Sequence, residues 1–132
     1  MMKHMMDFLF MAVVLLTACS GGAGGTATST DAPAPPIPAG DAVRGQKVFK
    51  DTCAACHGPK ATGIPGLGKN LTTSEFAKGK TDAELVAFIK KGRPTSDPAN
   101  TTGVAMPPKG GNAALTDQDL ADAVAYIRTL QK

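Results

Sequence analysis

The sequence contains no tryptophan, one tyrosine and no dense run of basic residues, and its net charge is only +3. Nucleic-acid binders usually combine clustered Lys and Arg with interleaved aromatic residues, so this class is excluded. The 132 residues, 42% of them hydrophobic, suit one domain. With 15 Gly, 10 Pro and few aromatic residues, large core side chains are scarce. A large apolar cofactor at the centre would therefore help such a domain to fold.

The N-terminus has the pattern of an export signal. Lys3 precedes an apolar run at 8–16, which is too short to span a bilayer comfortably but is typical of a secretory signal. The run ends in LTAC at 16–19, which resembles the lipobox of bacterial lipoproteins. We therefore expect residues 1–18 to be a lipoprotein signal peptide and Cys19 to be the lipidated first residue of the mature chain. The alternative is an ordinary signal peptide with an unrelated cysteine at its cleavage point.

Residues 19–40 form the expected tether. After Cys19 they are mostly Gly, Ala, Thr and Pro, a composition that cannot bury a core and is typical of a flexible linker. About 20 such residues reach roughly 25 Å. Acyl chains on Cys19 would hold the chain on the periplasmic side of a bacterial membrane. Ser20 favours the outer membrane by resemblance to proteobacterial sorting, in which aspartate at that position is the usual inner-membrane retention signal.

The stretch Cys53-Ala54-Ala55-Cys56-His57 carries the only histidine and the only close cysteine pair that remain after the signal peptide. Two thiols one helical turn apart can each add to a vinyl group of one haem. The adjacent imidazole is then placed beneath the iron as its proximal ligand. The motif predicts one covalently bound haem c.

Three other interpretations of this motif differ in strength. A thioredoxin-like pair follows a buried strand, whereas residues 43–52 look helical and contain no β-branched run. A structural zinc site needs four ligands, and the chain beyond Cys19 offers only Cys53, Cys56 and His57. A structural disulfide beside an incidental histidine remains open, because exported chains often contain disulfides.

Three helices are expected from 41 to 132, the residues that we assign to the folded domain. Asp41 can cap a helix that runs from Ala42 through the cysteine motif, and a glycine inside that helix, Gly45, indicates close approach to another element. Capping boxes beginning at Thr81 and Thr116 each precede an amphipathic pattern of three to four turns. The fold class is therefore all-α, and the simplest meaning of these apolar faces is core packing.

Two loops between the helices carry candidate functional groups. The Gly-rich loop at 57–72 can offer a backbone carbonyl to the outer nitrogen of His57, with Pro65 and the stretch 68–71 as candidates. The long loop between the second and third helices contains Met106, the only methionine outside the signal peptide, followed by two prolines. A lone methionine is usually a core residue. Given the upstream motif, Met106 is instead the candidate distal ligand of the iron.

This order of elements resembles the class I c-type cytochromes, and most of all the small domains in the haem subunit of cbb3-type oxidases. The resemblance covers residues 41–131 and implies a cytochrome c fold, with three main helices wrapped around one haem. It also implies a contact of Gly45 and Phe49 with the C-terminal helix near Ala123 and Tyr126. The implied haem-binding residues are Cys53 and Cys56 as thioether attachments, His57 as proximal ligand and Met106 as distal ligand.

The chain departs from the family pattern in two places. Relatives often have Gly-Pro-x-Leu where this chain has Gly68-Lys69-Asn70-Leu71, so the sequence does not identify the carbonyl that orients the histidine. Relatives also often have a larger aliphatic residue at the position of Ala123. Neither departure affects a predicted ligand.

The resemblance implies an electron carrier rather than an enzyme: a tethered protein that moves single electrons between respiratory or periplasmic redox partners. Lys60, Lys69 and Lys109 lie in loops expected around the haem edge and could steer an acidic partner. The main alternative is a haem subunit of a periplasmic dehydrogenase or oxidase complex. A peroxidase-like site with an open distal face and a small-gas sensor are the others.

Overall fold

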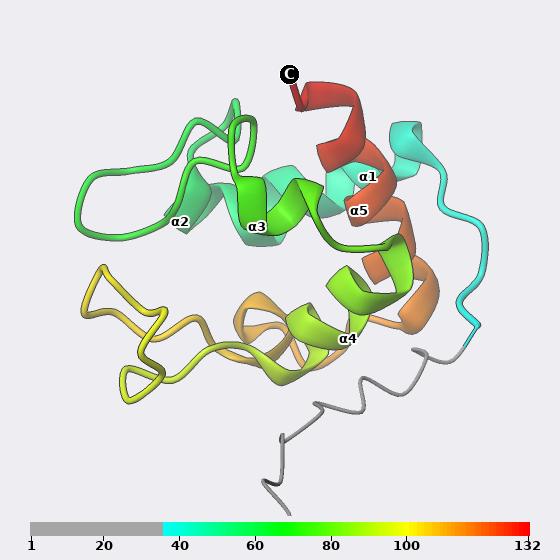
Figure 1. Cartoon of the computed structure of the whole chain (residues 1–132). Helices are drawn as coiled ribbons and strands as arrows, with labels where there is room; N and C mark the ends of the chain where they lie inside the picture. The colour runs from blue at the N-terminus through cyan, green and yellow to red at the C-terminus, as the bar shows by residue number, and fades with distance from the viewer. Residues whose placement is uncertain (1–35) are drawn as a thin grey trace, which may run out of the picture. The chain divides into compact units, whose positions relative to one another are not determined.

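The computed structural model describes residues 36–132 (Figure 1). The expected signal peptide, Cys19 and most of the expected linker lie outside these residues. The described chain is helical and contains two isolated β-bridges but no strand, which confirms the all-α prediction. None of its helices has the length and apolarity needed to cross a membrane. The elements are α1 (Ala42–Val48), the π-helical η1 (Phe49–Cys53), α2 (Ala54–His57), α3 (Glu75–Lys78), α4 (Asp82–Lys91), the 3₁₀-helical η2 (Pro108–Gly111) and α5 (Asp117–Leu130).

The predicted first helix is continuous from Ala42 through the cysteine motif, but it contains a π-helical segment. Asp41 caps it as expected, its side chain accepting from the backbone N–H groups of Val43 and Arg44 at 2.8 and 3.0 Å. The backbone then widens through η1, where the N–H of Ala54 donates to the carbonyl of Phe49. Such wider turns change the direction in which the following side chains point, and they are frequent beside functional sites. Here the turn immediately precedes Cys53 and Cys56.

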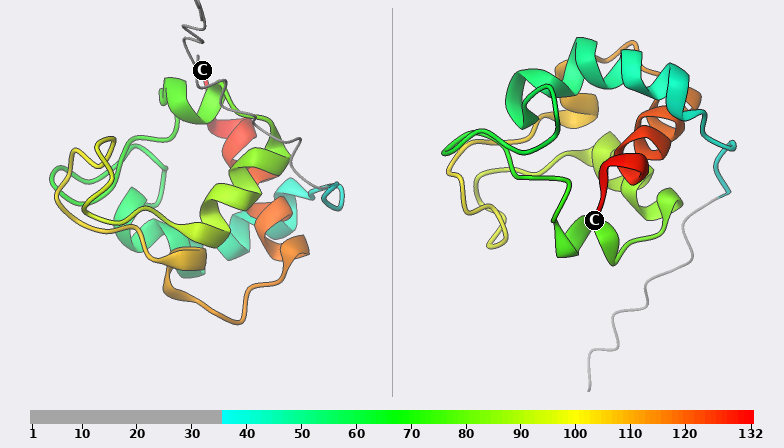
Figure 2. Two further views of the ribbon diagram at one scale, coloured as in Figure 1. Left: turned by 60° about the horizontal axis from the view of Figure 1, so that its bottom comes forward. Right: turned by 90° about the horizontal axis from the view of Figure 1, so that it is seen from above.

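The first and last helices cross at Gly45. A Cβ at this position would lie 1.8 Å from the carbonyl oxygen of Asp122 in α5, so only glycine permits the approach. One turn later the rings of Phe49 and Tyr126 meet with their centroids 5.5 Å apart. The contact expected from the resemblance is therefore present. Both views of Figure 2 show α5 (orange to red) against α1 (cyan), and α4 also packs on α5.

The apolar core has two parts, and α5 contributes residues to both. The larger contains Ala77, Leu85, Val86, Leu120, Ala121 and Val124. The smaller contains Phe49, Ala61 and Ile127, with Cys53, Leu71 and Tyr126 packed against it. The predicted capping boxes are both present, because Thr81 and Thr116 accept from the N–H groups of Glu84 and Asp119. The amphipathic patterns at 82–91 and 117–130 thus mark the core.

The packed chain begins earlier than the expected boundary at Asp41. Ile37 packs on the larger core part. The side chain of Gln118 donates to the carbonyl of Ala39 at 2.9 Å. Gly40 lies so close to α5 that a Cβ would be 2.2 Å from the carbonyl oxygen of Ala121. Residues 37–40, which we had assigned to the linker, therefore pack against α5.

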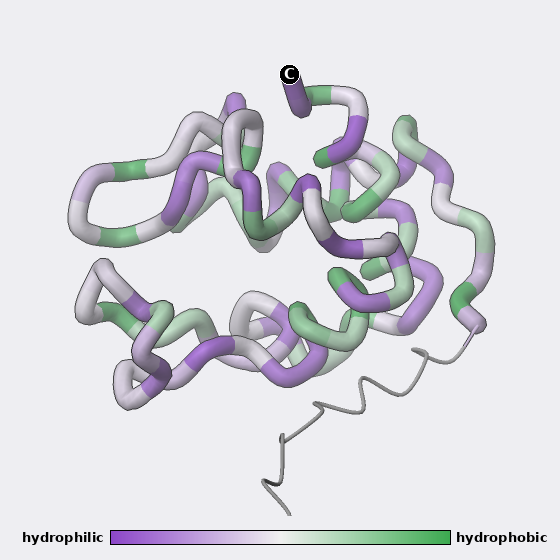
Figure 3. Tube along the Cα trace, viewed as in Figure 1, coloured by the Kyte–Doolittle hydropathy of each residue, from purple (hydrophilic) through white to green (hydrophobic). Residues whose placement is uncertain are grey.

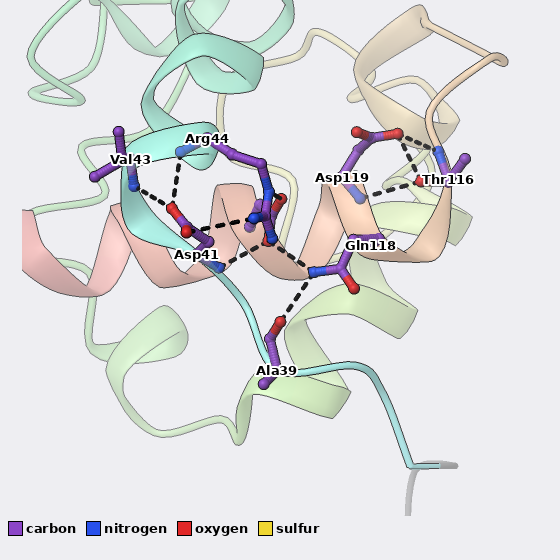
Figure 4. Close-up of polar contacts among 8 residues, drawn as sticks. Ala39, Asp41, Val43, Arg44, Thr116, Gln118 and Asp119 are labelled. Carbon is purple, nitrogen blue, oxygen red and sulfur yellow. Dashed lines mark hydrogen bonds and ion pairs between the residues drawn. The ribbon is translucent and has the colours of Figure 1, made fainter.

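A buried carboxylate joins the first helix to the last (Figure 4). Asp122 is 2% exposed. It accepts from Arg44 through Nε at 2.8 Å and through a terminal nitrogen at 3.1 Å, from the N–H of Asp41 at 2.7 Å and from Gln118 at 2.8 Å. The hydrogen bonds from Arg44 are the main reason why the pKa of Asp122 lies below its ordinary value; burial opposes them. The carboxylate thus ties α1, α5 and the start of the domain together.

We expect Asp122→Asn to destabilise the protein by roughly 2 kcal/mol, because charge-assisted bonds are lost and a buried donor faces an amide. Denaturant unfolding at neutral pH would measure this. A depressed folded pKa gives stability above the unfolded pKa that is lost as pH falls through the folded value. The difference between wild type and variant should therefore be constant at neutral pH and shrink below about pH 4.

Asp51→Asn is the matched control, because Asp51 pairs with Lys47 on the surface and such pairs contribute little. An Asp122→Asn protein as stable as this control at neutral pH would contradict the proposed role of the network.

Candidate functional site

A cavity of about 500 Å³ opens between two walls of the domain. One wall is α2 and the loop that follows it; the other is α4 and the loop that follows that helix. In the view of Figure 1, α2 and its loop lie above α4 and its loop. All four sequence-predicted site residues of the domain line this one cavity: Cys53, Cys56, His57 and Met106. The structure therefore brings together side chains that are 53 residues apart in sequence.

Both cysteines of the motif are free thiols and half-buried. Burial raises the pKa of Cys53 to about 11, and electrostatic repulsion from Cys56 adds a smaller increase. A reactive thiol of the thioredoxin type needs the opposite, a depressed pKa that yields thiolate near neutrality. The environment of Cys53 thus opposes a reactive redox pair, and both cysteines face a large cavity.

The imidazole of His57 is oriented by the backbone of the Gly-rich loop. Its Nδ1 lies 2.8 Å from the carbonyl oxygen of Lys69. A carbonyl only accepts, so Nδ1 carries the proton and Nε2 is left as the free donor for a metal. This contact identifies the carbonyl that the sequence left open: it belongs to the stretch 68–71 and not to Pro65.

Close backbone contacts hold this loop against α2. The N–H of Gly63 donates to the carbonyl of His57 at 2.8 Å. A Cβ on Gly68 would lie 2.3 Å from the carbonyl oxygen of Cys56, so this position needs glycine just before the carbonyl that binds His57. Ile64 and Gly68 also form an isolated bridge that closes the loop. The glycines of the loop therefore place the Lys69 carbonyl.

Met106 is held by the end of α4. It forms an isolated bridge with Arg93, with N–H to carbonyl distances of 2.8 and 2.9 Å. Gly92 ends the helix with φ of 72°, and a Cβ there would lie 2.3 Å from the carbonyl oxygen of Met106. Farther along, Gly110 of η2 approaches the side chain of Thr52 in η1. The methionine loop is thus attached to both α4 and the cysteine-bearing helix.

Sequence reasoning placed Lys69 near the haem edge but did not assign the aromatic residues or Arg93 to the lining. Phe76, Phe88 and Arg93 all face the cavity, and the Phe76 and Phe88 rings meet edge to face at 5.0 Å. A pattern of apolar spacing can place Phe88 on the buried face of a helix, but it cannot distinguish a cavity wall from core. The short helix α3, which carries Phe76, and the helical turn η2 were not predicted either.

The lining suits an iron porphyrin. Apolar side chains dominate, with two thiols, an imidazole and a thioether as the donor set. This combination matches covalent haem with His and Met ligands. Residues 36–132 contain no group of three or more His, Cys, Asp or Glu that could hold a metal ion.

Comparison with known proteins gives a consistent result. A family model described as cytochrome c matches residues 42–131. The chain is 38% identical to cytochrome c-555 of Chlorobaculum tepidum over 88 residues, which are 66% of this chain and 74% of that protein. It is 35% identical to cytochrome c-554(547) of Halothiobacillus neapolitanus over 94 residues, 70% of this chain and the whole of that protein.

The chain also resembles part of a larger protein. It is 42% identical to the cbb3-type cytochrome c oxidase subunit FixP of Bradyrhizobium sp. (strain ORS 278) over 60 residues, which are 45% of this chain. That match spans only 21% of FixP. The similarity to FixP therefore concerns one segment of it.

Gly68→Ala should disturb the site, because its Cβ would force the loop away from Cys56 and lengthen the bond between His57 and the Lys69 carbonyl. In the haem-containing protein, we expect the Nδ1 proton of His57 to exchange faster with solvent, as observed by NMR.

Gly79→Ala is the control: its φ is −75° and its nearest contact for a Cβ is 3.2 Å. Equal exchange rates in wild type and Gly68→Ala would show that the close approach does not position the histidine.

Proposed function

The chain belongs to the cytochrome c family, and on this basis we propose that it is a lipid-anchored carrier of single electrons on the periplasmic side of a bacterial membrane. Its coarser function follows from the family: it is a mono-haem c-type cytochrome that carries electrons. The haem, bound covalently, supplies the one-electron couple of its iron. The observation that most strongly supports the proposal is that the cysteine motif and Met106 line the same cavity.

The proposed axial ligands are His57 and Met106, and the proposed thioether attachments are Cys53 and Cys56. Hydrogen bonding of Nδ1 to the Lys69 carbonyl would fix the ring and increase the electron donation of Nε2. Pro107 and the bridge to Arg93 restrict the loop of Met106. A thioether is a weak donor that favours reduced iron, so this ligand pair supports a high reduction potential.

Two apolar residues beside the cavity support docking of a redox partner near it. Ile64 is 36% exposed, and Val104, which also lines the cavity, is 41% exposed. They come from the two loops that flank the cavity, and Figure 3 shows apolar stretches in both. Lys109 is a weaker candidate for steering a partner than expected, because its ammonium donates to the carbonyls of Ala113 and Leu115.

A second candidate function is a haem-bearing subunit of a larger redox complex. The observation that favours it is the segment shared with FixP, which is named as a subunit of a cbb3-type oxidase. Co-purification of the full chain with a large oxidoreductase, in stoichiometric amounts, would favour this role over free diffusion.

Substitution of Met106 tests the ligand proposal. In the haem-containing protein, Met106→Ala should abolish the weak sulfur-to-iron charge-transfer band, lower the reduction potential and open the distal face to carbon monoxide. Val104→Ala, in the same loop and cavity wall, serves as the control and should retain the band. A wild-type spectrum without the band, or a band that survives Met106→Ala, would show that the sulfur does not bind iron.

The lipid anchor has a separate test. Expression of the full chain in a bacterium supplied with a labelled fatty acid should give labelled, membrane-associated protein, and Cys19→Ser should lose both properties while haem attachment persists. Soluble, unlabelled wild-type protein would mean that Cys19 is an unrelated cysteine in an ordinary signal peptide.

A further inference from the structure

The charge in the cavity lining has one sign. Among the described residues that line it, Lys69 and Arg93 are charged at neutral pH, and no Asp or Glu faces the cavity. The rest of the lining is apolar, aromatic or uncharged polar, apart from the imidazole of His57. Arg93 is half-buried and Lys69 is exposed, so a partly buried and a solvent-facing cation border an otherwise apolar cavity, an arrangement that favours an anionic group between them.

The two cations converge although they come from opposite walls. Arg93 follows α4 and donates from Nη1 to the carbonyl of Ala99 at 3.3 Å. Lys69 belongs to the Gly-rich loop, and its ammonium donates to the hydroxyl of Thr101. The segment at 99–101 therefore marks one positively charged end of the cavity.

The Arg93 side chain is held in place but retains unused hydrogen-bonding capacity. Its Cζ lies 4.7 Å from the ring centre of Phe76 and 4.8 Å from that of Phe88, so the guanidinium is packed against both rings. It is 17% exposed, and its Nε lies 3.2 Å from a carboxylate oxygen of Asp97. That contact is poorly directed, because the buried Nε has no hydrogen-bond partner among the described residues.

Haem carries two propionate carboxylates, and a planar guanidinium is the side chain best suited to bind a carboxylate with two parallel hydrogen bonds. We propose that Arg93 and Lys69 form the propionate subsite of this cytochrome, with Arg93 as the main donor. Phe76 and Phe88 act as positioning residues that aim the guanidinium. Lys69 then has two roles. Its backbone carbonyl accepts a hydrogen bond from His57, and its ammonium group lies near the propionates.

The proposed subsite would raise the reduction potential of the haem iron. Reduction lowers the positive charge on iron, so a fixed cation close to the haem favours the reduced state, and it does so strongly in a medium of low dielectric constant. The inference requires covalent haem, which the family provides, but it depends neither on ligation by Met106 nor on a lipid on Cys19.

The test compares haem-containing wild type with Arg93→Met and Arg93→Lys. We expect Arg93→Met to shift the one-electron equilibrium about tenfold toward the oxidised state, a midpoint potential lower by about 59 mV. Resonance Raman spectroscopy should also show a shift of the propionate bending modes. Arg93→Lys keeps the charge but loses the planar fork, so the potential should be largely retained while the propionate modes still shift.

Lys91→Met is the matched control, because it removes the same charge from the same end of α4 at an exposed residue outside the cavity. It should leave both readouts almost unchanged. The proposal is overturned if Arg93→Met and Lys91→Met change the potential equally, or if the propionate modes are unaffected in both Arg93 variants. Should Arg93→Met fail to accumulate with haem, the modes of Arg93→Lys decide alone. Absence of the sulfur-to-iron band from the wild-type spectrum would show that Met106 does not bind iron. It would not affect the comparison of the Arg93 variants.

Discussion

The close crossing of α1 and α5 at Gly45 determines how the other parts of the domain are arranged. The absence of a side chain at Gly45 lets the two backbones meet at Asp122, where the buried carboxylate then binds Arg44 and the N–H of Asp41. Since α1 continues through η1 into α2, fixing its angle against α5 also fixes the direction in which the cysteine motif points. Phe49 packs on Tyr126 at the next turn and closes the smaller part of the core.

Close backbone contacts, more than side-chain contacts, hold the two walls of the site in position. On one wall, Gly68 approaches Cys56 and so brings the Lys69 carbonyl to His57. On the other wall, Gly92 ends α4 against the backbone of Met106. The side chain of Lys69 connects the two walls by donating to Thr101. These contacts set the spacing between the two walls of the cavity.

Much of this architecture could be predicted from the sequence, because its signals are local. The capping boxes at Thr81 and Thr116 specified where α4 and α5 begin, and Gly45 indicated a helix crossing. The π-helical turn at 49–53, the short helix α3 and the packing of Ile37 could not be predicted, since they depend on tertiary contacts that leave no periodic pattern. The orienting carbonyl and the position of Arg93 in the cavity were hidden for the same reason: both are consequences of how irregular loops fold back on the helices.

In the proposed function, this cytochrome carries electrons at a closed, six-coordinate haem. Exposing the purified, reduced protein to carbon monoxide while recording its optical spectrum, together with a potentiometric titration, tests this proposal. We expect low-spin spectra in both oxidation states, a reversible one-electron titration and no rapid binding of carbon monoxide. A high-spin reduced spectrum with rapid binding would contradict it, and would mean that the distal face is open for ligand sensing or catalysis.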